Sequence, residues 1–462
     1  MEKRYNMGFV WMICLIAALG GLLFGYDWVV IGGAKPFFVK FFHLEGKEDA
    51  IGWAMSSALV GCIGGSIVSG MASDKFGRKR LLILSGFLFT LSAILTGLAN
   101  DFNMFIWARI IGGVGIGLAS NLSPMYIAET SPAEMRGKFV SVNQLTIVAG
   151  VVLAQVVNWM IAQNMPADFT DQQIMDSWYG QYGWRWMFAA ETVPASMFFM
   201  MMFFIPESPR WLVKNGRIED AQKVLGRVGG DDYARSEVED IRKTLENETG
   251  KVRFGELVES RMAKVVLIGV FLAALQQWCG INVLFYYAED VFKAAGYDIS
   301  GIMLNIVTTG LVMLVFTFVA IFTVDRLGRR FLLILGVGGL TILYAAIGAC
   351  YHFDVKGVSV LILVLAAIAC YSFSLAPVTW VLLSELFPNR IRGAAMSISV
   401  FVLWLTCWAL AQGFPKMNAY LGPDGSFWAF GVVCFLGTVF ILFAVPETKG
   451  KSLEDIEREL VD

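Results

Sequence analysis

The most regular feature of the chain is a series of apolar stretches of roughly 20 residues, separated by short polar connections. A helix needs about that many residues to cross the hydrocarbon core of a bilayer. The pattern therefore predicts an all-α membrane protein. We expect twelve transmembrane helices, near residues 8–33, 51–73, 80–99, 103–126, 138–162, 184–205, 263–287, 299–324, 330–350, 357–384, 392–414 and 426–445.

One long polar segment, residues 206–262, interrupts this series between the sixth and seventh spans. Its stretch 218–246 mixes acids and bases at helical spacing, which predicts solvated helices. The chain therefore divides into an N-terminal six-helix bundle (1–205), a helical linker (206–262), a C-terminal six-helix bundle (263–445) and a polar tail (446–462).

Composition supports a bilayer environment, because 57% of the residues are hydrophobic and only 16% are charged. Soluble domains carry about 25% charged residues. The seven cysteines fall in or beside apolar stretches without metal-site spacing, and no phosphate-binding GxxxxGK[ST] loop is present. We expect no enzymatic activity, metal, organic cofactor or nucleic-acid partner; the predicted partners are the lipid bilayer and a small solute.

The distribution of basic residues predicts the orientation. Cytoplasmic loops carry the excess of lysine and arginine, so both termini are expected in the cytoplasm. The connection 163–183 has three acids and no base. Lys35, Lys40 and Lys47, in the first outer connection, are exceptions to this rule. The basic connections follow spans 2, 4, 8 and 10 and contain Lys75, Arg78, Lys79, Arg80, Arg136, Lys138, Arg326, Arg329, Arg330, Arg390 and Arg392.

The two halves repeat each other. The pairs are DKFGRKR (74–80) with DRLGRR (325–330), RG (136–137) with RG (392–393), and PES (206–208) with PET (446–448). Their offsets are 251 (325 − 74), 256 (392 − 136) and 240 (446 − 206) residues. Three motifs that keep their order and near-constant spacing predict two pseudo-symmetric bundles with a substrate cavity between them.

Asp27 and Arg109 are the charged residues that most need an explanation, because each lies inside an apolar span. Span 1 runs outward and span 4 runs inward, which places both residues roughly 9 Å below the outer boundary. Charges inside a membrane usually pair with each other. Movement of Arg109 relative to Asp27 would change the affinity of this carboxylate for a proton. Glu191, in the outer part of span 6, is a weaker candidate for the same relay.

Eight motifs cover nearly the whole chain. They are GGLLFGYD (20–27), DKFGRKR (74–80), RIIGGVGIGLASNLSPMYIAE (109–129), PESPRWL (206–212), QQWCGINVLFYYA (276–288), VDRLGRR (324–330), WVLLSELFPNRIRG (380–393) and PETKGKSLEDIE (446–457). These motifs resemble those of the sugar porters of the major facilitator superfamily, and PESPRWL, PETKG and the QQxxGIN run are the most specific. The nearest resemblance is to the bacterial D-xylose/proton symporters.

The resemblance implies a sugar site made of amides and aromatic rings. Amides can donate to and accept from sugar hydroxyls, and an aromatic wall suits the apolar face of a sugar. Gln276 and Gln277 also fall near mid-membrane, where bonding between helices is the alternative role. The implied sugar ligands are Gln144, Gln276, Gln277 and Asn282, with Trp380 and Trp404 as indole contacts and Phe24 and Tyr286 as lining and outer-gate aromatics.

Two positions depart from the resembling symporters. Met313 and Leu403 stand where those proteins have an asparagine and a glutamine. Each departure removes a polar partner, and one hydrogen bond is worth about 0.5–1.5 kcal/mol net. A pentose such as D-xylose is the first expectation for the substrate, and L-arabinose, glucose and galactose stay open.

Charged residues of both signs recur at repeat-related positions on the cytoplasmic edge. We expect them to form an inner gate of salt bridges that hold the bundles together when the outer mouth is open. Surface pairs are individually worth about 0–1 kcal/mol, so a network would bias the state without locking it. The candidates are Glu129, Arg136, Glu207, Arg210, Glu385, Arg392 and Glu447.

The sequence therefore predicts a proton-coupled symporter that imports a monosaccharide by alternating access, with H⁺ as the coupling ion. In the resembling symporters an acid occupies the position of Asp27, whereas uniporting glucose carriers have an amide there. The alternatives are a facilitative uniporter and a membrane sugar sensor that does not transport. We expect a functional monomer in a bacterial inner membrane.

Overall fold

The computed structural model describes residues 5–166, 169–247, 260–387 and 392–449, in which all regular secondary structure is helical. The first half contains α1 (Met7–Phe41), α2 (Glu48–Phe76), α3 (Arg78–Gly97), α4 (Phe102–Thr130), α5 (Arg136–Ala162), α6 (Asp171–Asp176), α7 (Trp184–Ala189) and α8 (Thr192–Met201). The middle contains α9 (Pro209–Lys214), α10 (Ile218–Gly229) and α11 (Asp231–Asn247). The second half contains α13 (Ser260–Trp278), α14 (Ile281–Tyr286), α15 (Ala288–Ala294), α16 (Ile299–Leu327), α17 (Arg329–His352), α18 (Val358–Phe373), α19 (Leu375–Leu386) and α20 (Arg392–Ala444).

The twelve predicted spans are confirmed. Ten helical segments of the described residues are long and apolar enough to cross a membrane. One of them holds two spans, because α20 merges two helices across Gly422, where φ is 71° and ψ is 174°. The remaining span, the sixth along the chain, is split into two short helices, α7 and α8, which meet at residues 190–191.

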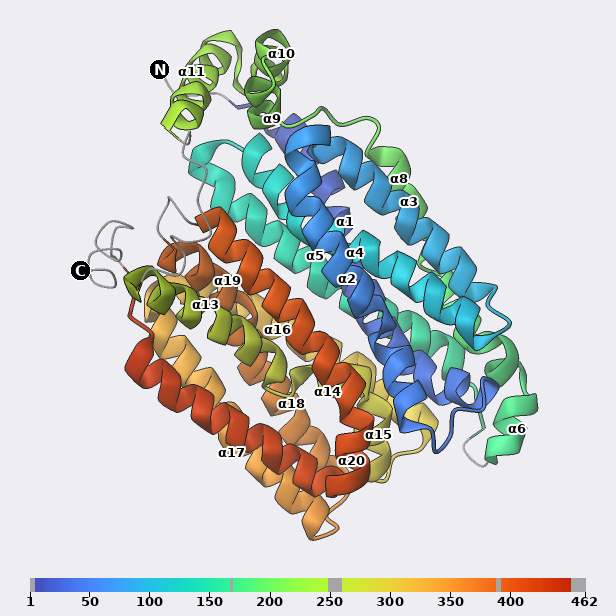
Figure 1. The fold of residues 1–462 in the computed structure, drawn as a ribbon. Helices are drawn as coiled ribbons and strands as arrows, with labels where there is room; N and C mark the ends of the chain where they lie inside the picture. Colours follow the sequence, from blue (N-terminus) through green and yellow to red (C-terminus); the bar gives the residue numbers. More distant parts are fainter. Residues whose placement is uncertain (1–4, 167–168, 248–259, 388–391, 450–462) are drawn as a thin grey trace.

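The helices form two bundles that lie side by side (Figure 1). Helices α1–α8 make the first bundle and α13–α20 the second, while α9–α11 lie at one end. The bundles meet mainly through α2 with α20 and α5 with α16. We call the end with the Gly77 turn (between α2 and α3) and the Gly328 turn (between α16 and α17) the basic face, and the other end the opposite face.

Broken helices place polar groups inside the second bundle. Helix α13 ends at Trp278, and Gly280 adopts φ 86°, a left-handed conformation that glycine reaches at no steric cost. A second break falls at Ser374, between α18 and α19. Backbone groups near such breaks are available to ligands and side chains.

The glycine-rich run 112–117 lets α2 and α4 approach closely. A Cβ atom on Gly113 would lie 1.8 Å from the carbonyl oxygen of Ala58. Small residues permit such contact between membrane helices. This run therefore serves helix packing, as its position inside a span predicts.

Helix α1 is longer than its predicted span. It continues through Pro36 to Phe41, so Lys35 and Lys40 lie within the helix and not in a connecting loop. Phe37 and Phe38 are fully buried, and both lysines are paired with acids. The apolar surface and these pairs stabilise the extra turns.

Candidate functional site

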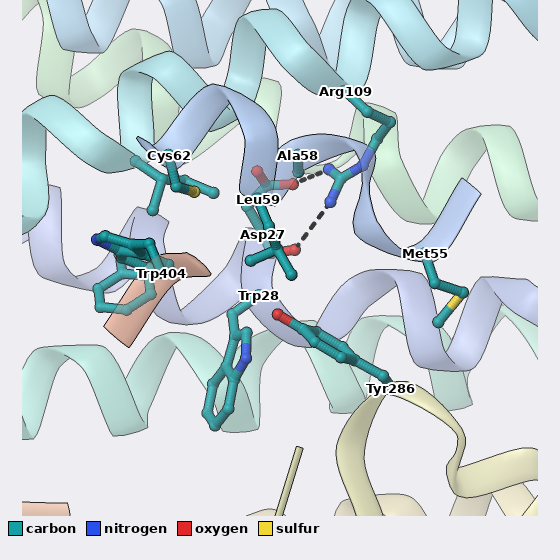
Figure 2. A pocket seen from close by; sticks show the side chains of 11 residues that line it. Asp27, Trp28, Met55, Ala58, Leu59, Cys62, Arg109, Tyr286 and Trp404 are labelled. Atoms are coloured by element: carbon teal, nitrogen blue, oxygen red, sulfur yellow. Dashed lines mark hydrogen bonds and ion pairs between the residues drawn. The ribbon is translucent and has the colours of Figure 1, made fainter. Parts of the chain in front are cut away.

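A small cavity lies between the two bundles, where α1, α2, α4, α14 and α20 meet (Figure 2). Its volume of about 10 Å³ leaves room for about one water molecule. In this form the cavity is too small for a monosaccharide. It is lined by Phe24, Asp27, Trp28, Met55, Ala58, Leu59, Cys62, Arg109 and Ile116 from the first half and by Tyr286 and Trp404 from the second.

Asp27 and Arg109 form a buried ion pair in this cavity. Each side chain belongs to a residue that is only 2% exposed. Arg109 Nη1 donates to Asp27 Oδ1, and Nη2 lies 3.4 Å from the Asp27 backbone oxygen (Figure 2). The guanidinium also lies 5.1 Å from the centre of the Phe188 ring. The two charges thus neutralise each other where neither is hydrated by bulk water.

The pair is incompletely satisfied and has an acidic neighbour. Within the described residues, Asp27 Oδ2, Arg109 Nε and Glu191 Oε1 are buried without a hydrogen-bond partner. Glu191 lies at the break between α7 and α8, within electrostatic range of both other groups. Two acids and one base are thus gathered in a dry region, where an uncompensated buried charge is costly. Their role in proton coupling stays a prediction.

Three of the candidate sugar contacts line the cavity. Phe24, Tyr286 and Trp404 converge on it from α1, α14 and α20. The rings of Phe24 and Trp404 lie 5.7 Å apart, and the Trp404 Nε1 is buried without a partner among the described residues. An aromatic wall with a free indole donor is therefore present at the seam between the bundles.

The candidate amides do not line this cavity. Gln276 Nε2 donates to the carbonyls of Leu375 and Ala376, at 3.1 and 3.3 Å, just after the α18–α19 break. Its Oε1 is buried without a partner in the described part of the chain. Asn282 Nδ2 donates to Gln277 Oε1 at 2.7 Å, and Gln144 is half-buried in α5. In this form Gln276, Gln277 and Asn282 therefore form hydrogen bonds within the second bundle.

Trp380 also lies apart from the cavity and is 38% exposed. Met313 and Leu403 are both buried. These two departures from the family pattern place apolar side chains in the interior of the second half. The sugar-contact role of Trp380 stays a prediction.

The charged candidates on the basic face form one cluster in each bundle. In the first, Arg78 Nη2 pairs with Glu129 at 2.9 Å, and Glu207 accepts from the backbone N–H groups of Arg78 and Lys79. The second bundle repeats this arrangement. Arg329 Nη2 pairs with Glu385 at 3.1 Å, and Glu447 accepts from the N–H groups of Arg329 and Arg330.

These two clusters each lie within one bundle. Arg136 Nε donates to the Ala128 carbonyl at 2.8 Å, also inside the first half, and Arg210 lies in α9. Helix α20 begins at Arg392, whose side chain lies outside the described residues. An inner gate that joins the two bundles therefore stays a prediction for another conformation.

Contacts between the bundles are found near the opposite face. Lys416 pairs with Asp49 at 2.7 Å, and Ser56 donates to Gln412 at 2.8 Å. Lys35 pairs with two acids of α15 across the same seam. The bundles are therefore joined at the opposite face.

Sequence reasoning missed several lining residues. Trp28 follows Asp27 directly and packs against Phe285 of the second half, with ring centres 5.1 Å apart. Cys62, one of the seven cysteines of the apolar stretches, lines the same cavity. The position of Trp28 next to an intramembrane acid is the signal that could have identified it. No group of three acids, histidines or cysteines in the described ranges could hold a metal ion.

Comparison with known proteins identifies relatives over almost the full length. A family model described as "Sugar (and other) transporter" matches residues 13–460. The D-xylose-proton symporter of Escherichia coli (strain K12) is 38% identical over 487 residues, covering 99% of this chain and 97% of that protein. The arabinose-proton symporter of Bacillus subtilis (strain 168) is 35% identical over 459 residues, covering 99% and 96%.

A solved structure agrees with these matches. The xylose transporter of E. coli, in a partially occluded inward-open conformation, superposes with a TM-score of 0.85 at 36% identity. The match covers 96% of this chain and 100% of that one. The resemblance inferred from the motifs is thereby confirmed, and the fold is that of a major facilitator.

Proposed function

The chain belongs to the sugar (and other) transporter family, and on this basis we propose that it is a proton-coupled symporter that imports a monosaccharide by alternating access. The observation that carries the proposal is the buried pair of Asp27 and Arg109 in a cavity lined by both bundles. Two relatives are named as proton symporters of pentoses, D-xylose and arabinose.

The proton acts as a conformational ligand in the proposed cycle. Protonation of Asp27 removes its negative charge and weakens its attraction for Arg109, while Glu191 is the alternative acidic partner. With Asp27 protonated and a sugar bound, the outer side can close. Release of both to the cytoplasm lets the pair re-form, and the empty carrier returns.

The proposed sugar site lies at the seam between the bundles. Trp404, Phe24 and Tyr286 supply the aromatic wall that already lines the cavity. Gln144, Gln276, Gln277, Asn282 and Trp380 complete the proposed contact set. Gln276 Oε1 is a buried acceptor without a partner among the described residues, which suits a sugar hydroxyl.

A pentose is the preferred substrate in this proposal, with hexoses as the other class. The basic face is the proposed cytoplasmic side, so that both termini lie in the cytoplasm and the two bundles span a bacterial inner membrane. The proposed working unit is a monomer made of two bundles (1–205 and 263–445), the linker (206–262) and the tail (446–462). Because the bundles are joined at the opposite face, the described form is closed on the proposed outer side.

The two clusters on the basic face are the proposed inner gate. In the outward-facing state their charged groups, with Arg136, Arg210 and Arg392, would bridge the bundles. In the described form these groups pair within each half, Arg78 with Glu129 and Arg329 with Glu385.

Uptake by the purified protein in proteoliposomes tests the proposal. Labelled pentoses and hexoses are offered singly, with and without an imposed inward proton gradient. We expect at least one pentose to accumulate above equilibrium only when the gradient is present. Equilibration that ignores the gradient would identify a uniporter, and binding without movement of sugar would identify a sensor.

A further inference from the structure

A buried lysine joins the two bundles at the opposite face. Lys35 of α1 is 6% exposed, and its Nζ lies 3.0 Å from Glu289 Oε2 and 2.8 Å from Asp290 Oδ1 of α15. The same Nζ lies 5.8 Å from the centre of the Tyr287 ring. One cation of the first half is thus surrounded by two carboxylates and a ring of the second half.

Other charges near this group are arranged around it. Lys40, one helical turn and a half further along α1, pairs with Asp171 of the same half at 3.0 Å. Lys40 and Lys293 act electrostatically on Glu289 from a greater distance. Lys35 is therefore the cation in direct contact with both acids of α15.

The ion pairs continue a contact that begins beside the cavity. Trp28, Gly32 and Lys35 lie on one face of α1, at i, i+4 and i+7. Trp28 packs on Phe285, and a Cβ atom on Gly32 would lie 2.1 Å from the Phe285 carbonyl oxygen. Helix α14 and the start of α15 are therefore held against α1 over two helical turns.

The segment held in this way is bounded by breaks in the helix. Gly280 precedes α14 with φ 86°, and Tyr287, with φ −117° and ψ 28°, separates α14 from α15. Helix α14 is six residues long and carries Asn282 and Tyr286, two of the proposed sugar contacts. A short helix between two breaks can move as a unit, because the breaks absorb the change in backbone angles. The ion pairs at the start of α15 therefore influence how much of the time α14 is held against α1.

We propose that Lys35 is a positioning residue that fastens the α14–α15 segment to α1, and so sets the balance between the outward-open state and the outward-closed state. This inference rests on the proposed transport function, because only an alternating carrier has both states. When the seam opens, water reaches all three charges. When it closes, Glu289 is buried, Asp290 becomes half-buried, and both carboxylates need Lys35 as their partner.

Removal of Lys35 has a defined consequence. In Lys35→Met, Glu289 and Asp290 stay close together without a cation, and burying them in the closed state becomes unfavourable. Breaking a buried pair by removing one partner is strongly destabilising, whereas the open state loses little. We expect the ratio of open to closed molecules to rise about tenfold or more.

Hydrogen–deuterium exchange of the full-length protein in lipid nanodiscs measures this balance on both faces at once. In Lys35→Met we expect faster exchange in residues 28–41 and 281–294. We also expect slower exchange at the Gly77 and Gly328 turns, because the basic face closes when the opposite face opens. A merely structural role for Lys35 would not slow exchange at these turns.

Two further variants serve as controls. Lys40→Met removes a similarly buried cation, 8% exposed, from the same helix, but its partner Asp171 belongs to the same half, so we expect no reciprocal change. Lys35→Glu combined with Glu289→Lys keeps the same three charges in exchanged places. We expect this double variant to restore the wild-type exchange pattern.

The possible results separate the inference from the function on which it rests. Unchanged exchange in Lys35→Met, faster exchange on both faces, or the same reciprocal pattern in Lys40→Met would overturn the inference. Sugar counterflow by the wild-type protein is measured in parallel. Counterflow with an unaltered Lys35→Met pattern refutes only the fastening, whereas absence of counterflow for every sugar refutes the proposed transport function itself.

Discussion

Arg109 of α4 contacts both the carboxylate and the backbone oxygen of Asp27 in α1, so that one guanidinium holds a side chain and the main chain of the same residue. The second carboxylate oxygen, Oδ2, is buried without a hydrogen bond in the described part of the chain. It is the atom at which a proton can be added without first breaking a hydrogen bond. The geometry therefore separates an unpartnered carboxylate oxygen, the proposed proton acceptor, from the oxygen that faces the counter-charge.

Asp27→Asn is expected to abolish accumulation driven by a proton gradient and to retain exchange of sugar. An amide has about the size of the carboxylate but neither gains nor loses a proton at physiological pH. The carrier therefore behaves as if residue 27 were permanently protonated. Accumulation and counterflow are measured in the same proteoliposomes. Accumulation above equilibrium by the variant would contradict the assignment of Asp27.

Two tryptophans provide a matched test of the sugar site. Trp404 lines the cavity and is 5% exposed, whereas Trp380 lies apart from it and is 38% exposed. Trp404→Ala is expected to weaken sugar affinity by about tenfold, the loss of one well-packed aromatic contact. Trp380→Ala should weaken it less. Titration of sugar by isothermal calorimetry compares the two, and a larger loss for Trp380 would relocate the site.

The architecture could be read from the sequence because the bilayer leaves few options. An apolar stretch of about 20 residues must satisfy its backbone internally and becomes a helix. The Asp27 and Arg109 pair followed from the depth of each residue in its span. Both inferences need only the number of residues from a boundary, which the sequence contains.

Features that depend on partners distant in the sequence cannot be predicted from the position of a residue within its span. The sequence pattern places Lys35 in the first outer connection, yet its partner Glu289 lies 254 residues away in the sequence and pairs with it inside the fold. Trp28 carries no periodic signal, because one aromatic residue in an apolar span is normally a core or lipid contact.

Gly113→Ala is expected to destabilise the first bundle. Its new Cβ atom would lie 1.8 Å from the backbone oxygen of Ala58, and a backbone cannot move aside as a flexible side chain can. Overpacking of this kind costs about 1–3 kcal/mol. Gly64→Ala, on the partner helix α2, meets nothing within 4 Å and is the control. Thermal unfolding in detergent should show a lower Tm for Gly113→Ala alone, and equal values for both variants would refute the packing role.

Asp74, on the basic face, should not contribute to the pH dependence of transport. Burial alone would raise the pKa of Asp74, but the hydrogen bond from Lys214 and the charge of Arg78 outweigh burial and hold the pKa below its ordinary value of 3.8. Because the pKa of Asp74 is lower in the folded state, its pairing contributes fully to folding stability at any pH above the pKa of the unfolded state. This contribution is lost only as the pH falls through the pKa of the folded state. Asp74 therefore stays ionised between about pH 5.5 and 8.

Asp74→Asn is accordingly expected to reduce the rate of transport and to leave the shape of its pH profile unchanged, because the variant loses a structural pair but no titrating group. Asp27→Asn should instead flatten the profile. Initial rates of sugar uptake, each normalised to its own maximum, are compared across that pH interval. A profile displaced by Asp74→Asn would mean that proton binding involves the basic face, and would weaken the case for a single proton site beside Arg109.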